Sequence, residues 1–358
     1  MSSIPLVDLA AAHAEVAEEV EAGFKRVIAA TAFVGGAEVA AFEQEYAAFT
    51  GLPHCVGVAN GTDALELALR AAGVGPGAEV ILPANTFIAT AEAVARIGAR
   101  VVLVDCDPRT YLIDTRAALA AVTPRTGAIV PVHLYGQLAP VEELRAAGVP
   151  VVEDAAQCQG ATRHGRGAGA DGIAATSFYP GKNLGAYGDA GAVVTASAGL
   201  ATTVRTLGSH GGLTRYRHDL AGMNSRLDAL QAVVLRAKLA RLAAGNERRR
   251  AAAARYDELL AGSGLTLPVT LDGNEHVWHI YAVRVPGGRR DEVLARLHAA
   301  GIGAAIHYPV PVHRTGAFGS LGGSFPHAEA AASELLSLPI YPQITPAQQA
   351  RVAEALGG

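Results

Sequence analysis

The strongest constraint on the fold of this chain is a regular alternation of short apolar runs and amphipathic segments between residues 55 and 195. The apolar runs are nearly continuous, which is typical of strands buried on both faces of a parallel sheet. Amphipathic segments that fit helices, such as 62–72, 89–97 and 116–121, lie between them. The pattern therefore predicts an α/β fold in which helices flank a mainly parallel sheet. The seven predicted strands are Cys55–Ala59, Glu79–Pro83, Arg100–Asp105, Ala128–Val132, Val151–Asp154, Ala174–Phe178 and Ala192–Thr195.

The pattern changes after Gly222 and indicates a second, smaller domain. A long helical stretch, 225–260, is rich in Ala, Leu and Arg and is predicted to connect the two domains with an interruption near Gly245. We therefore expect a large domain at 1–240, including an N-terminal arm, and a small α+β domain at 241–358. The small domain is predicted to contain a strand at 276–285, a helix at 290–300, a His/Pro-rich loop at 307–314 and two further helices.

The composition is that of a globular protein, and its charge favours a small-molecule ligand over a polyanionic partner. Of 358 residues, 50% are hydrophobic and 17% are charged, which is enough to build a sizeable core. The 29 Lys and Arg against 33 Asp and Glu give a net charge of −4. Binding to nucleic acid or to an anionic membrane needs a basic surface, so neither partner is expected.

The cysteines and the N-terminus predict neither a disulfide, a metal site nor export. Cys55, Cys106 and Cys158 are far apart and form no CxxC pair. The N-terminus lacks a basic segment followed by an apolar one, and no apolar run approaches the roughly 18 residues of a membrane span. We expect a cytoplasmic protein without a metal ion.

The first motif with chemical meaning is Asn60-Gly61-Thr62-Asp63, which follows a predicted strand and opens a predicted helix. A helix N-terminus offers free N–H groups and the positive end of a dipole, so Gly61 and Thr62 are candidates for binding a phosphate. A simple helix cap by Thr62 or Asp63 is the alternative interpretation.

The second motif is Glu153-Asp154-Ala155-Ala156-Gln157, at the carboxyl end of a predicted strand. Open α/β sheets bind their ligands at this edge. A carboxylate buried there needs a cation or hydrogen-bond donors, which makes Asp154 a candidate partner for a protonated ring nitrogen. A helix-capping aspartate is the alternative.

The third motif surrounds Lys182, in the Gly-rich segment SFYPGKNLGAYGD that begins at Ser177. A lysine on a rigid, partly desolvated loop can have a lowered pKa and act as an amine nucleophile towards an aldehyde. A solvated loop lysine is the alternative.

Together the three motifs indicate one cofactor. A phosphate site, a strand-end aspartate and a lysine 28 residues beyond it are the contacts that pyridoxal 5′-phosphate (PLP) requires. The phosphate is anchored, the ring nitrogen keeps its proton and the aldehyde is held by the lysine as a Schiff base.

The chain resembles the DegT/DnrJ/EryC1/StrS family of sugar aminotransferases along essentially its whole length. The resemblance implies the PLP-dependent transferase fold of type I, with a mainly parallel seven-stranded sheet. It rests on the segments NGTDAL from Asn60, PANTFIAT from Pro83, PVHLYGQ from Pro131, VEDAAQ from Val152, SFYPGKNLGAYGDAGAVVT from Ser177, GMNSRLDALQA from Gly222 and IHYPVPVH from Ile306.

The resemblance also assigns roles at the ring of the cofactor. Lys182 would bind PLP covalently and, once released, move protons, while Asp154 would pair with the ring nitrogen. Phe87 would stack on the ring and Gln157 would lie near the 3′-oxygen, with His133 nearby. Phe87 could instead belong to the core, and His133 could be a hydrogen-bonded histidine at a strand end.

At the phosphate, the resemblance implies contacts from Gly61, Thr62 and Ser177. Asn224, in the NSRLD segment, would reach the phosphate of the neighbouring subunit, so two subunits of a homodimer would share each active site. A helix cap is the alternative role for Asn224.

The implied reaction is amino transfer from L-glutamate to a nucleotide-linked keto sugar, with pyridoxamine 5′-phosphate (PMP) as the second cofactor form. His307, Tyr308 and His313 are the expected sugar contacts. Charged candidates for binding the diphosphate are Arg215, Arg217, Arg226, His307, His313 and Arg314.

The segments HLYGQ and HYPVPVH resemble the branch of the family that aminates C3 of dTDP-3-keto-6-deoxyhexoses. Amination at C4 of an NDP-4-keto sugar is the alternative, and neither the nucleotide nor the stereochemistry is predicted.

Two other classes of protein share some of these motifs. A regulatory protein that binds PLP without turnover is disfavoured because Lys182 and Asp154 are both present. A PLP-dependent decarboxylase, racemase or lyase fits the cofactor motifs but not the NSRLD and HYPVPVH segments.

Overall fold

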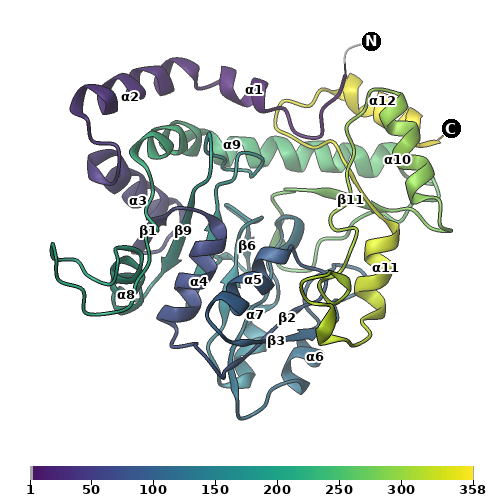
Figure 1. Ribbon diagram of the computed structural model, residues 1–358. Helices are drawn as coiled ribbons and strands as arrows, with labels where there is room; N and C mark the ends of the chain where they lie inside the picture. The colour runs from purple at the N-terminus through teal and green to yellow at the C-terminus, as the bar shows by residue number, and fades with distance from the viewer. Residues whose placement is uncertain (1–2, 358) are drawn as a thin grey trace.

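The computed structural model describes residues 3–357, and its centre is a layer of β-strands between helices (Figure 1). All seven segments predicted as strands form strands, with ends that differ by at most three residues. They are β1 (His54–Val58), β2 (Glu79–Pro83), β3 (Arg100–Val104), β4 (Thr126–Ile129), β5 (Val152–Asp154), β8 (Ile173–Ser177) and β9 (Gly191–Thr195).

These strands form a three-stranded sheet of order β3-β2-β4 and a four-stranded sheet of order β1-β9-β8-β5. Two parallel bridges, Ile129 to Val151 and Val132 to Asp154, connect the sheets where β4 meets β5. Pairing is parallel for β2 with β3 and β4 and for β5 with β8, whereas β9 is antiparallel to both β8 and β1. The strand layer is therefore mixed, and mainly parallel.

The predicted strand at 128–132 ends early, at Ile129. Pro131 has no N–H and cannot donate to a ladder, but its carbonyl accepts a hydrogen bond from the Asp154 N–H at 2.9 Å. In return the His133 N–H donates to the Asp154 carbonyl at 3.0 Å. These two bonds fix the backbone of Asp154 at the joint between the sheets.

Both faces of the four-stranded sheet are covered, which explains the continuous apolar runs. On one face, Val193 and Ala175 pack against α4 (Gly61–Ala71), α5 (Ile88–Arg96) and α8 (Ala198–Gly208). Ala174, Ala192 and Val194 point to the other side and pack against α3 (Gly36–Thr50) and α9 (Ala229–Leu259).

Helix α9 differs from its prediction in two ways. It begins at Ala229 rather than at residue 225. The preceding residues are extended, because Asn224 forms a β-bridge with Ser209 and Asp228 forms one with Val34. It also continues through Gly245, which is buried against Pro342, so the predicted interruption is wrong. The predicted boundary between residues 240 and 241 falls inside this helix, and the division into domains stays a prediction.

The strand predicted at 276–285 is also wrong in part. Residues 281–284 form β11 (Tyr281–Arg284), but Trp278 adopts a left-handed conformation with φ 47°. The Val277 and Ile280 N–H groups donate to the carbonyls of Gly136 and Tyr135 instead of to a neighbouring strand. This bend turns residues 276–280 towards the large sheet.

The remaining C-terminal elements follow the prediction, with one strand added. Helices α10 (Arg290–Ala299), α11 (Pro326–Glu334) and α12 (Pro346–Gly357) are present, and β12 (Leu335–Leu338) pairs antiparallel with β11. In Figure 1 helix α9 runs from the side of α3 to the side of α10 and α12.

Within residues 3–357 no helix is long and apolar enough to cross a membrane. The other elements are α1 (Leu9–Ala14), α2 (Ala17–Ala30), α6 (Thr115–Ala120), α7 (Val141–Leu144), β6 (Thr162–Arg163), β7 (Arg166–Gly167), β10 (Asn274–Glu275) and the short 3₁₀ turns Leu134–Gly136, Arg145–Ala147, Val312–Arg314 and Gly319–Leu321.

An aromatic cluster between α3 and the end of β8 tests the stability of this core. Phe42 is fully buried and packs edge-on against Phe178, with ring centroids 5.4 Å apart. We predict that Phe42→Ala lowers the free energy of unfolding by about 3–5 kcal/mol, because a cavity remains where the ring was. Urea denaturation measures this loss. Leu321→Ala, at an exposed position, is the control and should change stability by less than about 0.5 kcal/mol; a similar loss in both variants would contradict the prediction.

Candidate active site

A cavity of about 740 Å³ opens at the carboxyl ends of β5 and β8 and at the N-terminus of α4. This is the edge at which open α/β sheets bind ligands. Nine of the site residues predicted from the sequence line it: Gly61, Thr62, Phe87, Asp154, Gln157, Ser177, Lys182, His307 and Tyr308.

Lys182 projects from the loop between β8 and β9 into this cavity. Its backbone N–H donates to the Tyr179 carbonyl at 2.8 Å, and the Ala186 N–H donates to the Phe178 carbonyl at 2.8 Å, so the loop is tightly turned. Burial lowers the pKa of Lys182 to about 8, although the nearby Asp154 carboxylate opposes this effect. Near neutral pH the side chain can therefore supply an unprotonated amine, as a nucleophile requires.

Asp154 is buried at the end of β5, and hydrogen bonds hold its carboxylate in place. The Thr90 hydroxyl donates to Oδ2 at 2.8 Å and the Ala156 N–H donates to Oδ1 at 3.1 Å. Burial raises the pKa of Asp154, while these donors and the Lys182 charge lower it. A cation placed against this carboxylate would relieve the cost of burying its charge.

The N-terminus of α4 forms the third side of the cavity. Asn60, rather than Thr62 or Asp63, caps the helix, because its Oδ1 accepts a hydrogen bond from the Asp63 N–H at 2.8 Å. A Cβ atom at Gly61 would lie 2.5 Å from the Ser177 Cβ, so only glycine lets the helix end approach β8 this closely. The free N–H groups of this turn face the cavity together with two hydroxyl side chains, an arrangement suited to a phosphate.

Gln157, Tyr308 and Phe87 form another part of the cavity wall. The Gln157 Nε2 donates to the Tyr308 hydroxyl at 2.9 Å and its Oε1 accepts from the Tyr135 N–H at 2.7 Å. The Phe87 ring lies 5.4 Å from the ring of Tyr308. Phe87 is 53% exposed, so it is not a core residue, and its ring is free to stack on a flat ligand.

Two predicted site residues lie outside this cavity. Asn224 lines a separate hollow of about 370 Å³ with Arg226 and Asp189, and Asp189 also borders the main cavity. His313 was predicted to contact the sugar, but it is buried with its Nε2 2.9 Å from Glu329 Oε1. It belongs to the short 3₁₀ turn Val312–Arg314 and does not line the cavity, and its contact with the sugar stays a prediction.

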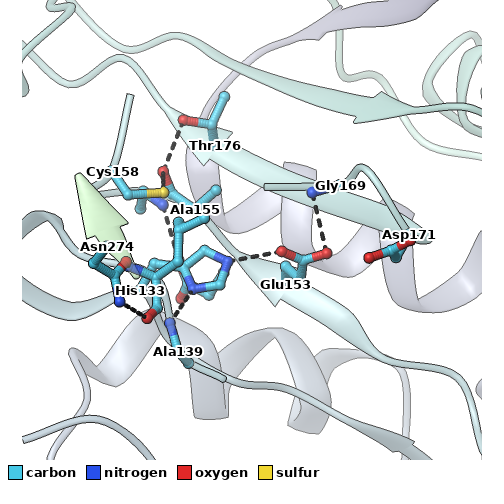
Figure 2. Close-up of polar contacts among 12 residues, drawn as sticks. His133, Ala139, Glu153, Ala155, Cys158, Gly169, Asp171, Thr176 and Asn274 are labelled. Atoms are coloured by element: carbon cyan, nitrogen blue, oxygen red, sulfur yellow. Dashed lines mark hydrogen bonds and ion pairs between the residues drawn. The ribbon is translucent and has the colours of Figure 1, made fainter. Parts of the chain in front are cut away.

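His133 is a hydrogen-bonded histidine at a strand end, the alternative role that the sequence left open (Figure 2). It is fully buried, accepts a hydrogen bond from the Ala139 N–H at Nδ1 and lies 2.8 Å from Glu153 Oε2 through Nε2. Glu153 also accepts from the Gly169 N–H at 3.1 Å. This cluster joins β5 to its surroundings on the side of the strand opposite Asp154.

Sequence reasoning missed three residues of the site. Thr90 stood in the segment PANTFIAT, but its bond to Asp154 spans 64 residues and has no local signal. Asn183 follows Lys182, and His279 lies in the segment that had been predicted as a strand. Both His279 and Asn183 belong to a hydrogen-bonded chain beside the cavity.

The charges and hydrogen-bonding groups of the residues in the cavity fit those of PLP. The buried Asp154 carboxylate needs a cation, which a protonated ring nitrogen supplies. Lys182 offers an amine for an aldehyde, and the α4 N-terminus with Ser177 offers donors for a phosphate. Within residues 3–357 no group of His, Cys, Asp and Glu side chains is arranged to hold a metal ion.

Comparison with known proteins agrees with this site. The chain is 46% identical to a UDP-N-acetyl-3-dehydro-alpha-D-glucosamine 3-aminotransferase of Acidithiobacillus ferrooxidans, over 99% of this chain and 97% of that protein. It is also 46% identical to a dTDP-3-amino-3,4,6-trideoxy-alpha-D-glucose transaminase of Streptomyces venezuelae, over 99% and 95%.

Two crystal structures have the same fold. That of S. venezuelae DesV in complex with a ketimine intermediate superposes with a TM-score of 0.97 at 45% identity, over 100% of this chain and 98% of that one. That of NtdA from Bacillus subtilis with bound cofactor PMP gives a TM-score of 0.92 at 32% identity, over 99% of this chain and 85% of that one.

The fold and the site thus define an enzyme of the aminotransferase class. Residues 14–357 match the DegT/DnrJ/EryC1/StrS aminotransferase family, and the chain belongs to that family.

The buried carboxylate of Asp154 gives the cofactor-free protein a pH-dependent instability. Its folded pKa is raised, so stability falls as pH rises from the ordinary carboxyl pKa, about 3.9, to the folded value. Asp154→Asn has no charge to bury, and we predict that its melting temperature relative to wild type is higher at pH 7 than at pH 4.

Thermal unfolding of both cofactor-free proteins between pH 4 and pH 8 measures this difference. Asp272→Asn, at an exposed position, is the control and should follow the wild-type pH dependence. If Asp154→Asn also followed it, the carboxylate would not carry the burial cost that we assign to it.

Proposed function

We propose that this enzyme uses PLP to transfer the amino group of L-glutamate to C3 of a nucleotide-linked 3-keto sugar, with a dTDP-3-keto-6-deoxyhexose as the favoured acceptor. The observation that carries the proposal is the convergence of Lys182, Asp154 and the N-terminus of α4 on one cavity. The names of both relatives place the nitrogen at C3, although one sugar is linked to UDP and the other to dTDP. Their names therefore support C3 over C4 more strongly than they support one nucleotide.

The cofactor, when bound, supplies an electron sink and carries the amino group between the two substrates. Lys182 holds and moves the proton at its Nζ, for which a pKa near 8 is well matched to neutral pH. Asp154 would hold the protonated ring nitrogen of the cofactor, and Thr90 fixes the orientation of the carboxylate. Gln157 and Tyr308, joined by a hydrogen bond, and Phe87, whose ring contacts Tyr308, would restrict the position of the ring of the cofactor.

The cavity of one chain has few charges for an anionic substrate, which supports a shared site. Its cationic lining residues are Lys182 and Arg96, and Arg96 is already paired with Glu66 at 2.9 Å and with Asp63 at 3.2 Å. A diphosphate carries two negative charges and needs donors from elsewhere.

We propose that a second subunit of a homodimer supplies these donors. The segment at 209–226 is largely exposed and contains Arg215, Arg217 and Arg226. The exposed apolar residues Leu213, Tyr216 and Leu220 belong to the same segment, as expected for a surface that packs against another chain. Asn224 beside Asp189 would then reach the cavity of the partner from its edge.

The acceptor is tested with matched sugars. The purified enzyme is converted to its PMP form with L-glutamate, and dTDP-3-keto and dTDP-4-keto 6-deoxyhexoses are then added separately while the absorbance of the PLP form is followed. We expect the absorbance to return with the 3-keto sugar, and to return at least about 100-fold more slowly with the 4-keto sugar, because the wrong carbon lies away from Lys182. Return with the 4-keto sugar alone would move the nitrogen to C4, and no conversion by glutamate would contradict the donor.

The shared site is tested by mixing subunits. Asn224→Ala and Lys182→Ala are each expected to have little activity as homodimers. If Asn224 serves the neighbouring site, a mixed dimer contains one intact site, so statistical mixing should restore about a quarter of the wild-type activity. Mixtures that stay as inactive as the separate variants would place Asn224 in the site of its own subunit or outside any site.

A further inference from the structure

Lys238, on helix α9, contacts the loop that carries Lys182, and the roles proposed above do not use it. Its Nζ donates a hydrogen bond to the Gly185 carbonyl at 2.7 Å and lies 4.6 Å from the centre of the Tyr187 ring. Lys238 does not line the cavity, so it can act on a ligand there only through other residues. The residues that it contacts belong to the segment that directly follows Lys182.

Gly185 connects this contact to Lys182 itself. A Cβ atom at Gly185 would collide with the Pro180 carbonyl oxygen, so the two limbs of the loop touch at this point. Pro180 stands just before Lys182, whose own N–H donates to the Tyr179 carbonyl at 2.8 Å. Because the limbs pack against each other with no side chain between them, a shift of the Gly185 carbonyl also moves the segment that carries Lys182.

A buried ammonium group is a costly way to fill the position of Lys238. Burial lowers the pKa of Lys238 to about 8, and among residues 3–357 no carboxylate forms an ion pair with it. Its polar contacts are the Gly185 carbonyl and the face of the Tyr187 ring, which both favour a cation. An apolar side chain of the same length would fill the space without the cost of burying a charge. The position therefore requires the hydrogen-bond donor, and not only the bulk, of lysine.

Helix α9 is a firm base for this hydrogen bond. Gln231 Oε1 accepts a hydrogen bond from the Tyr187 N–H at 2.8 Å, and Asn246 Oδ1 accepts one from Asn183 Nδ2 at 3.0 Å. With Lys238 between them, these residues stand at intervals of seven and eight, which places all three on one face of the helix. The loop is thus held on α9 at both ends and in its middle, and Lys238 makes the middle contact.

We propose that Lys238 is a positioning residue: its hydrogen bond to Gly185 holds the loop so that Lys182 Nζ meets the aldehyde of PLP. Lys182 adds through Nζ to the aldehyde carbon, and loss of one water molecule leaves a C=N bond between the two atoms. The inference rests on the proposed function only in that Lys182 joins the cofactor. It requires no sugar substrate.

The test separates joining the cofactor from binding it. The full-length protein is freed of cofactor, and PLP is then added while the absorbance of the covalent form is followed by stopped flow. Lys238→Met keeps the length of the side chain but removes the donor, so we expect the covalent bond to form about 10- to 100-fold more slowly. The analogue 4′-deoxypyridoxine 5′-phosphate has the ring nitrogen and the phosphate but no aldehyde. Its dissociation constant should stay within about twofold of the wild-type value, because Lys238 is remote from those contacts.

This split distinguishes positioning from a general role in stability. If Lys238→Met joins PLP at the wild-type rate, the proposal is overturned. Equal losses in the rate and in the affinity for the analogue would overturn it as well, because they indicate that the site is disturbed as a whole. Lys25→Met, at an exposed lysine of α2, is the control and should match the wild type in both measurements.

Chemical rescue tests the donor itself in a folded protein, and it replaces Lys238→Met if that change prevents folding. Lys238→Cys is treated with 2-bromoethylamine, which attaches an aminoethyl group to the new thiol and rebuilds a side chain close to lysine in length. The three native cysteines are buried and should be spared, and the wild type treated in the same way is the control. Treatment should return the rate to within about threefold of wild type; a rate that stays low after complete modification overturns the proposal. If the enzyme aminated no keto sugar, these results would still stand, and only the proposed function would be contradicted.

Discussion

The buried carboxylate of Asp154 is the constraint on which the site depends. It lies where the two sheets meet: backbone bonds to Pro131 and His133 fix its main chain, and Thr90 and the Ala156 N–H hold its carboxylate. Burial opposes its charge, while burial of Lys182 opposes the charge of that amine. Because the two charges have opposite signs, each makes the other easier to keep ionised. A cationic ring placed between them would relieve the carboxylate and leave the lysine free to lose its proton.

The part of the cavity around Lys182 has few charged side chains, so it suits proton transfer better than binding of an anionic nucleotide. Apart from Asp154, the titratable side chains that line the cavity near Lys182 are kept neutral: burial and the lysine charge lower the pKa of His307 to about 4, and burial raises the pKa of Tyr308. The charges that an anionic nucleotide needs are absent from this part of the cavity. Strong ionic contacts at the reacting carbon would compete with proton transfer, which is consistent with our proposal that charged recognition uses the segment of Asn224 and Arg226.

The sequence predicted the strand layer well, and it pointed to Asp154 and Lys182, which line one cavity, because both signals are local. A strand buried on two faces is continuously apolar, and Asp154 and Lys182 stand where such strands end. What failed depends on distant contacts. The bend at Trp278 exists because Val277 bonds to Gly136, and the partnership of Thr90 with Asp154 joins segments far apart in sequence. His313 shares a motif with Tyr308, but it lies in a separate short turn and pairs with Glu329 instead of lining the cavity.

Helix α9 links the site to the C-terminal part of the chain by a single rigid element. Its 31 residues make a rod about 46 Å long. Asn246 near its middle fixes Asn183, and one turn later Arg249 donates to the carbonyls of Trp278 and Ile340. Any kink between Gly245 and Arg249 would displace both anchors at once. Harmful mutations in this enzyme are therefore expected along the buried face of α9, where they could reorient the cavity wall while every residue that touches a ligand remained intact.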